Sequence, residues 1–318
     1  MPLRRRRARS AVDLSVRLGP LSLPNPVVAA SGTFGHGDEV ARVCDPARLG
    51  AVTSKSVAPF EWQGNPPLRT TEAPGGGMLN SIGLPGPGVE RWIAEDLPAL
   101  EAHGARVIAS IWGRSVDDYA TCARALKAVA HRIVALEVNL SCPNVEDRSR
   151  VFAHSQGGTG AALRAVTGAL GDAVPVFAKL SPNVTDLVAI ARAAIDAGAT
   201  GLTLVNTVMG LAIDADARSP VLGAGGGGLS GAPIKPIALR AVWDVSRALP
   251  GVPIIGTGGV TSGTDAVEMM LAGASAVGVG TATFAEPRAT IRIVDELRAW
   301  CAGHGVERVR ELTGGMRA

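Results

Sequence analysis

The sequence predicts a (β/α)₈ barrel, and three observations lead to that fold class. Short apolar runs rich in β-branched residues alternate with longer amphipathic stretches along the 318 residues. Most of these runs are nearly continuous, which is typical of parallel strands buried on both faces. Eight such runs in about 300 residues match the size of this barrel. The predicted strands are 27–30, 51–55, 106–111, 133–140, 174–180, 201–207, 252–256 and 276–280.

The helices expected between these strands carry their own start and stop signals. Ser115 and Asp118 have the spacing of a capping box, and Gly104 and Gly198 follow last turns. An open doubly wound sheet is the alternative fold, but residues 30–35 are a poor match to a G-x-G-x-x-G turn. The predicted helices are 89–103, 116–131, 161–171, 185–197, 233–249 and 264–272.

One domain is expected over residues 15–310, between a disordered basic tail at 1–14 and a C-terminal tail at 311–318. Residues 17–25 predict a small hairpin that covers the bottom of the barrel. The long loops 56–88 and 207–231 both follow strands, so they should lie on the C-terminal face, where barrel active sites occur.

Composition excludes several classes of protein. Arg4 to Arg7 and Arg9 supply five positive charges, and without them the formal net charge changes from +3 to −2. With only 3% aromatic residues, neither a basic nucleic-acid footprint nor a base-stacking surface is indicated. No run is long enough for a transmembrane helix, and no apolar region follows the arginines as in a signal peptide. We therefore expect a cytoplasmic protein with no membrane partner.

The four cysteines suggest two different roles. No pair has C-x-x-C spacing, so neither a metal nor an iron–sulfur motif is expected. Cys44, Cys122 and Cys301 are predicted to be small buried core residues. Cys142 differs because it lies in Asn139-Leu140-Ser141-Cys142-Pro143-Asn144, directly after the fourth strand. A thiol at the barrel mouth can act as a nucleophile or a general base.

Other polar residues gather at the predicted strand ends. Lys55 and Lys179 follow apolar strands, which suggests an anionic ligand or a cofactor that gains negative charge. Four asparagines at the same level, Asn80, Asn139, Asn144 and Asn206, suit a ring with alternating donors and acceptors. Glycine-rich turns after the last two strands, 256–260 and 278–281, are typical of a phosphate site. The glycine run 223–231 is either a flexible lid or a close approach to a ligand.

Two of these motifs identify a resemblance that extends from about Ser15 to about Arg310. The segment around Cys142, together with Gly76-Gly77-Met78-Leu79-Asn80-Ser81-Ile82-Gly83-Leu84, resembles class 1 dihydroorotate dehydrogenases. Residues 32–35 (Gly-Thr-Phe-Gly) and 64–67 (Gly-Asn-Pro-Pro) favour the 1B, NAD-linked subfamily. The resemblance implies an FMN-binding barrel, a flavoprotein oxidoreductase that oxidises dihydroorotate to orotate in pyrimidine (UMP) biosynthesis.

The resemblance also implies roles for individual residues. Cys142 would take the C5 proton of the substrate while a hydride passes from C6 to flavin N5. The implied substrate-binding residues are Lys55, Asn80, Ser81, Ile82, Gly83, Leu84, Asn139, Asn144, Asn206 and Thr207. The implied FMN-binding residues are Ser31, Lys55, Ser56, Asn139, Lys179, Val205, Gly231, Gly258, Gly259, Gly280 and Thr281. No metal ligand is expected.

Two residues depart from the family pattern. Ser110 stands where the family often has asparagine, which is expected to weaken one flavin contact. Gly86 replaces another common asparagine, and here only a loop turn is expected to change.

The resemblance also implies partners. Members of the 1B subfamily pair with a second subunit that carries FAD and a [2Fe–2S] cluster and passes electrons to NAD, and we also expect a homodimeric core. A 1A-like enzyme that uses fumarate is the nearest alternative. A flavin-dependent RNA-modifying enzyme and a non-catalytic flavin-binding protein are more distant ones.

Overall fold

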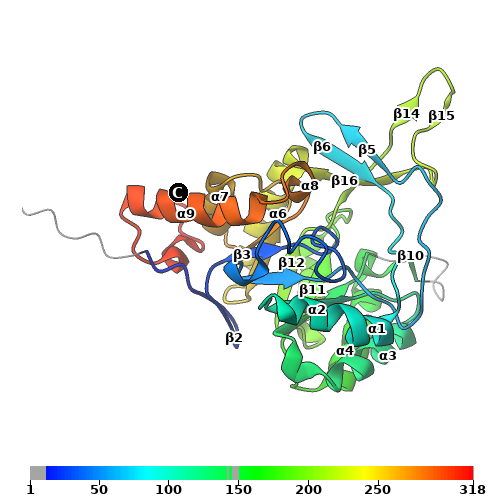
Figure 1. Cartoon of the computed structure of the whole chain (residues 1–318), viewed down its shortest axis with the longest axis horizontal. Coiled ribbons are helices and arrows are strands. Elements are labelled where there is room, and N and C mark those ends of the chain that lie inside the picture. Colours follow the sequence, from blue (N-terminus) through cyan, green and yellow to red (C-terminus); the bar gives the residue numbers. More distant parts are fainter. Residues whose placement is uncertain (1–11, 142, 145–149, 318) are drawn as a thin grey trace, which may run out of the picture.

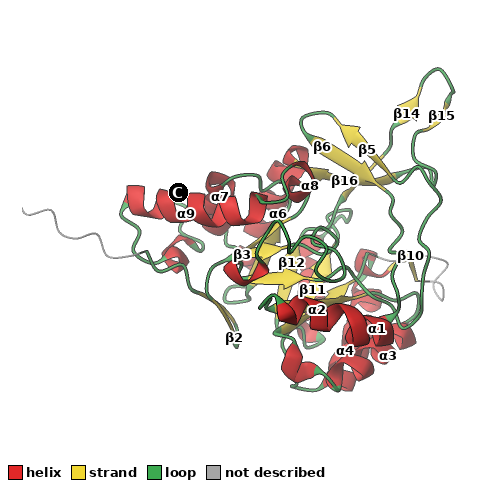
Figure 2. Cartoon of the chain, viewed as in Figure 1, coloured by secondary structure: helices red, strands yellow, loops and turns green. Residues whose placement is uncertain are grey.

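The computed structural model describes residues 12–141, 143–144 and 150–317. Its centre is a closed barrel of eight parallel strands, so the predicted fold class is confirmed (Figures 1 and 2). The order around the barrel is β3–β4–β7–β8–β11–β12–β17–β18, with β18 pairing back onto β3. These strands are β3 (Val27–Ala29), β4 (Ala51–Thr53), β7 (Val107–Ile111), β8 (Ala135–Asn139), β11 (Val176–Leu180), β12 (Gly201–Leu204), β17 (Ile254–Thr257) and β18 (Ala276–Val279).

Helices surround the barrel and cover its apolar outer face, with one large hydrophobic core beneath them. Ser115 begins α3 with the predicted capping box, and Ser262 begins α7 in the same way. The α-helices are α1 (Val89–Arg91), α2 (Leu97–Ala102), α3 (Val116–Lys127), α4 (Gln156–Leu170), α5 (Leu187–Asp196), α6 (Lys235–Ala248), α7 (Gly263–Leu271), α8 (Ala282–Ala285) and α9 (Ala289–His304). Short 3₁₀ turns are η1 (Pro46–Arg48), η3 (Ala130–Arg132), η4 (Phe152–His154), η5 (Ala232–Ile234) and η6 (Val309–Leu312).

Two helix predictions need correction, and the long helix α9 was not predicted. The stretch 89–103 is not one α-helix, because a π-helical segment, η2 (Trp92–Asp96), separates α1 from α2. Pro98 in the next turn has no N–H to donate, which favours such a local change of hydrogen-bond pattern. Helix α4 begins at Gln156, earlier than the predicted 161, because Ser155 caps it ahead of three glycines. Helix α9 was not predicted, although Gly305 ends it in the left-handed conformation that usually marks a C-cap.

The predicted hairpin at the start of the chain is confirmed as β1 (Val16–Leu18) and β2 (Leu21–Leu23). Gly19 makes its turn and lies against Thr200, which precedes β12, so the hairpin is at the N-terminal end of the barrel. Leu14 and Leu312 are both buried, on either side of the predicted domain limits 15 and 310. Packed chain therefore extends beyond those limits at both ends.

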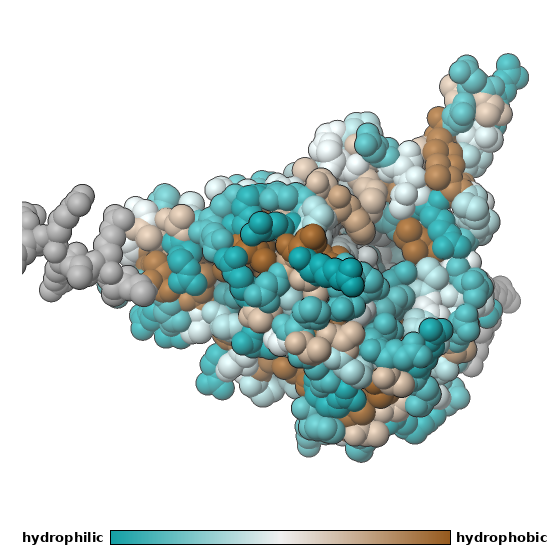
Figure 3. Space-filling model, in the orientation of Figure 1, coloured by the Kyte–Doolittle hydropathy of each residue, from teal (hydrophilic) through white to brown (hydrophobic). Residues whose placement is uncertain are grey.

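The two long loops contain strands that the sequence did not predict. Residues from both loops form a four-stranded antiparallel sheet in the order β13–β16–β6–β5 above the barrel mouth (Figure 1). These strands are β5 (Thr70–Ala73), β6 (Gly77–Asn80), β13 (Val208–Gly210) and β16 (Gly227–Gly231). The small pair β14 (Ile213–Asp214) and β15 (Ser219–Pro220) extends as an arm, and Figure 3 shows apolar surface at its base.

Candidate functional site

Parallel strands bring the predicted polar residues to one end of the barrel. Lys55 follows β4, Asn139 ends β8, and Lys179 is the second-to-last residue of β11. Asn206 follows β12, and the glycine turns follow β17 and β18. Because all eight strands point the same way, these residues meet at the C-terminal mouth.

Three of the predicted binding residues form one hydrogen-bonded chain across the mouth. Asn206 Nδ2 donates to Asn139 Oδ1 at 3.3 Å and to Ser141 Oγ at 2.9 Å. Asn139 Nδ2 donates in turn to Ser56 Oγ at 3.2 Å. The N–H of Thr207 donates to Asn206 Oδ1 at 2.8 Å, which fixes the orientation of that amide. The amides are thus held in place from three different strands.

A cluster of serine hydroxyls lies beside these amides. Ser56 Oγ is 2.9 Å from Ser110 Oγ and 3.3 Å from Ser31 Oγ. Ser110, the departure from the family pattern, is fully buried and donates to Glu137 Oε1 at 3.2 Å. Its hydroxyl therefore belongs to a continuous polar network inside the barrel.

Glu137 is a site residue that the sequence analysis missed. Its side chain lies inside the barrel, where Thr203 Oγ1 donates to Oε2 at 3.0 Å and Lys179 Nζ lies 3.8 Å from Oε1. Both oxygens accept hydrogen bonds, as an ionised carboxylate does. The available signal was the only charged residue in the predicted strand 133–140.

The environment of Lys55 differs from that of Lys179. Burial lowers the pKa of Lys55, Glu39 opposes that effect, and Arg69 adds to it. Among the described residues, no carboxylate lies within ion-pairing distance of its ammonium. Burial, with a further contribution from Lys55, also lowers the pKa of nearby His36 to about 4, so His36 is neutral at pH 7. Lys55 therefore offers at the mouth an ammonium that forms no ion pair within the described part of the chain.

The second sheet brings Asn80 and Thr207 to the site. Asn80 lies opposite Gly228 in the β6–β16 pair, and Asn80 Nδ2 donates to Gly228 O at 3.2 Å. A Cβ on Gly228 would lie only 2.0 Å from Thr207 Oγ1, so glycine permits this close approach. The end of the run 223–231 is therefore the strand β16, in which Gly228 lies close to Asn80 and Thr207, two predicted substrate residues.

The predicted substrate loop 81–84 is supported by the small aromatic cluster of Phe60, Trp62 and Trp112. Trp62 Nε1 donates to Gly83 O at 2.9 Å, and Leu84 packs against the cluster. Ser81 Oγ is buried and has no hydrogen-bond partner among the described residues. The loop thus presents an unused hydroxyl.

The Gly86 departure has a local structural reason. The backbone of Gly86 pairs with Trp62 in both directions, at 3.0 and 2.9 Å. A Cβ at this position would lie 3.0 Å from His36 Nε2, a buried atom without a partner in the described chain. Glycine therefore leaves room for His36 beside Lys55.

The glycine turns after β17 and β18 form the opposite flank of the mouth. Gly258 and Gly259 have positive φ values of 132° and 75°, and an added Cβ on either would collide with α6 or the residues before it. A Cβ on Gly280 would make only ordinary van der Waals contacts, at 3.7 Å with Thr33 and 3.8 Å with Ala30, so a side chain here would not collide with the described chain. Thr257 Oγ1 is buried nearby without a partner in the described chain. Thr281 Oγ1 donates to Ser230 Oγ at 2.8 Å, which ties the turn to β16 beside Gly231.

Comparison with known proteins gives the family. The dihydroorotate dehydrogenase family model matches residues 13–300. The chain belongs to the dihydroorotate dehydrogenase family. It is similar to the "Dihydroorotate dehydrogenase B (NAD(+)), catalytic subunit" of Pelobacter propionicus, with 47% identity over 96% of this chain and 98% of that protein. Proteins with the same name from Bacteroides thetaiotaomicron and Geobacter sp. are 42% and 44% identical, each over 96% of this chain and 99% and 98% of their own lengths.

Some predicted residues are placed only in part. Cys142 lies outside the described residues. Asn144 is in the short strand β9 (Pro143–Asn144), which pairs with β10 (Arg150–Val151). Val205 is buried, and its N–H donates to Thr257 O at 2.8 Å. The other three cysteines are free and buried, as predicted.

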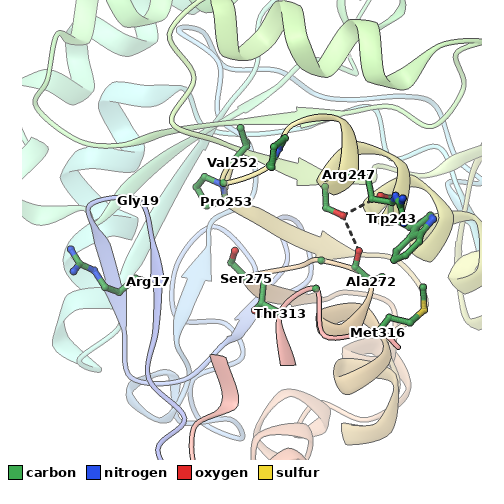
Figure 4. A pocket seen from close by; sticks show the side chains of 15 residues that line it. Arg17, Gly19, Trp243, Arg247, Val252, Pro253, Ala272, Ser275, Thr313 and Met316 are labelled. Atoms are coloured by element: carbon green, nitrogen blue, oxygen red, sulfur yellow. Dashed lines mark hydrogen bonds between the residues drawn. The ribbon is translucent and has the colours of Figure 1, made fainter. Parts of the chain in front are cut away.

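A cavity of about 460 Å³ lies far from this site (Figure 4). Its lining includes Arg17, Trp243, Arg247 and Ser275, which belong to or flank the N-terminal hairpin, α6 and the start of β18. None of the predicted site residues lines it, so it does not mark the chemistry. The described residues contain no cluster of three potential metal ligands, and no described helix is long and apolar enough to span a membrane.

Proposed function

We propose that this chain oxidises dihydroorotate to orotate in pyrimidine biosynthesis, with FMN as its bound cofactor. The single observation that carries the proposal is the set of complementary groups at the mouth. Lys55, whose ammonium forms no ion pair within the described residues, is followed by Ser56, which accepts a hydrogen bond from the amide chain of Asn139 and Asn206. An anionic pyrimidine needs this combination, since its carboxylate requires a cation and its ring requires donors and acceptors.

The residues around the mouth also fit FMN. The Thr257 hydroxyl is buried without a partner in the described chain, with Gly278 close beside it, and the loops after the last two barrel strands are the usual phosphate site of this fold. We propose that these turns hold the phosphate, while the serine hydroxyls and Lys179 lie along the ring. The proposed FMN-binding residues are Ser31, Lys55, Ser56, Asn139, Lys179, Val205, Gly231, Gly258, Gly259, Gly280 and Thr281.

The protein's own chemistry is then proton removal and orientation. Cys142 is proposed as the general base that takes the C5 proton, and Lys55 as the partner of the substrate carboxylate. Loss of that proton and of a hydride from C6 forms the double bond of orotate. When bound, FMN supplies the acceptor for the hydride. The proposed substrate-binding residues are Lys55, Asn80, Ser81, Ile82, Gly83, Leu84, Asn139, Asn144, Asn206 and Thr207.

We further propose that electrons leave the chain through a separate subunit carrying FAD and a [2Fe–2S] cluster, and reach NAD there. The relatives are named NAD-linked catalytic subunits, which supports a separate partner. No redox-active metal cluster can be assembled from the described residues. A homodimeric core is part of the same proposal.

An anaerobic titration tests the proposed reaction. The purified chain should show flavin absorbance that bleaches on addition of dihydroorotate. Lys55→Met should keep the flavin but require much more dihydroorotate for bleaching. The surface variant Lys127→Met is the matched control and should behave as wild type. Flavin that dihydroorotate leaves oxidised would contradict the proposal.

A further inference from the structure

The polar network inside the barrel contains one charged group that the proposed reaction does not use, Glu137. This side chain is only 3% exposed. Its carboxylate accepts hydrogen bonds from Ser110 Oγ at 3.2 Å and Thr203 Oγ1 at 3.0 Å, and Lys179 Nζ lies 3.8 Å away. A buried carboxylate is costly unless it is paired and hydrogen-bonded in this way. The presence of this buried carboxylate is therefore not explained by packing alone.

Strand register shows how the two charges are ordered along the barrel axis. Lys179 lies opposite Asn139 of β8, whereas Glu137 lies opposite Phe177, two residues earlier on β11. Two residues of a strand rise by about 6.6 Å, so Glu137 starts deeper in the barrel than Asn139 and Lys179. Along the strands, Lys179 is thus nearer to the mouth than Glu137.

We infer that Glu137 is a positioning residue that sets the electron affinity of the flavin through Lys179. The inference rests on the proposed function, which places the flavin ring at the mouth. Reduction makes that ring anionic, and the Lys179 ammonium stabilises the added charge. The carboxylate behind Lys179 opposes this effect, because its negative charge acts on the same ring from a greater distance. Glu137 therefore limits the pull of Lys179 on electrons.

The test is the flavin midpoint potential of Glu137→Gln, a change of nearly constant shape that removes one charge. The affinity for reduced relative to oxidised FMN should increase about tenfold, which corresponds to about 30 mV for a two-electron couple. Glu137→Asp keeps the charge and should restore a potential close to wild type. Glu101→Gln is the matched control. It also breaks a carboxylate–cation pair, with Arg132, but outside the barrel interior, so its potential should not change.

A second readout is independent of turnover. The affinity of the apoprotein for oxidised FMN should change by less than about threefold in Glu137→Gln, because only the reduced ring carries the added charge. If Glu137→Gln alone does not fold, Glu137→Gln can be combined with Lys179→Met to leave a neutral pair. The potential of that double variant should exceed that of Lys179→Met alone.

An unchanged or lower potential in Glu137→Gln, or equal potentials in the double variant and Lys179→Met, would overturn the inference. Failure of the proposed function looks different. In that case dihydroorotate would not bleach the wild-type flavin, whatever the potential of the Glu137 variants.

Discussion

Replacing Gly228 with alanine should weaken substrate binding without preventing folding. The backbone of Gly228 is not in the left-handed region, so alanine is conformationally allowed. Its Cβ, however, would lie 2.0 Å from Thr207 Oγ1 and 2.5 Å from Thr207 Cβ. Real Cβ contacts are essentially never shorter than 3.0 Å, so Thr207 has to move by about 1 Å.

The size of the effect follows from the cost of that displacement. Overpacking of this kind typically costs about 1–3 kcal/mol. That cost falls on the arrangement that binds substrate. The affinity for orotate should therefore decrease about 5- to 150-fold, since about 1.4 kcal/mol equals a factor of ten. The measurement is a titration of the flavoprotein with orotate, followed by the flavin absorbance change.

Two further variants separate the collision from a general glycine effect. Gly168→Ala introduces the same methyl group into α4, where no atom lies within 4 Å, and should stabilise the protein by about 1 kcal/mol. In a Thr207→Gly background, Gly228→Ala should cost little further, because all three colliding atoms of Thr207, Oγ1, Cβ and Cγ2, are absent. Orotate affinity within about threefold of wild type in Gly228→Ala would refute the reasoning.

Three other predictions concern chemistry, electron transfer and stability. Cys142→Ala should keep FMN but slow flavin reduction by dihydroorotate about 10²–10⁴-fold, measured by stopped-flow absorbance, and Cys142→Ser should be partly active at most. Equal rates of flavin reduction in wild type and Cys142→Ala would exclude Cys142 as the base. The isolated chain should reduce artificial dyes but reduce NAD poorly until an FAD and iron–sulfur subunit is added, and efficient turnover with fumarate alone would favour the 1A-like alternative. Burial raises the pKa of Asp265, but hydrogen bonds from Lys235, Thr261 and Ser262 outweigh it and lower the value to about 2. Because the pKa is lower in the folded state, ionised Asp265 stabilises the fold above pH 3.8, and this stabilisation is lost as the pH falls toward 2. In wild type the free energy of unfolding in urea should therefore decrease by about 2 kcal/mol over this pH range because of Asp265. In Asp265→Asn this part of the decrease should be absent.

The barrel was predictable because its signals are local. Each strand is a short apolar run, and Ser115 with Asp118 marks a helix start through contacts three residues apart. The gathering of the polar residues was predictable for the same reason, since parallel strands must end on the same side and Lys55, Asn139 and Lys179 each lie at or just after a strand end. The local pattern did not predict the π-helical segment before Pro98, because the apolar spacing does not show which backbone hydrogen bonds form there.

The sequence by itself thus determined the fold class and the end of the barrel at which the predicted polar residues gather. Only the tertiary structure decided which groups touch. The sheet above the mouth pairs residues such as Asn80 and Gly228, which are 148 positions apart, and no periodicity reports such a pairing. The partner of Glu137 was equally hidden, because a lone carboxylate in a strand does not reveal that Lys179 lies 3.8 Å away on the neighbouring strand. Charge balance in a buried site depends on such distances, and those are fixed only when the barrel closes.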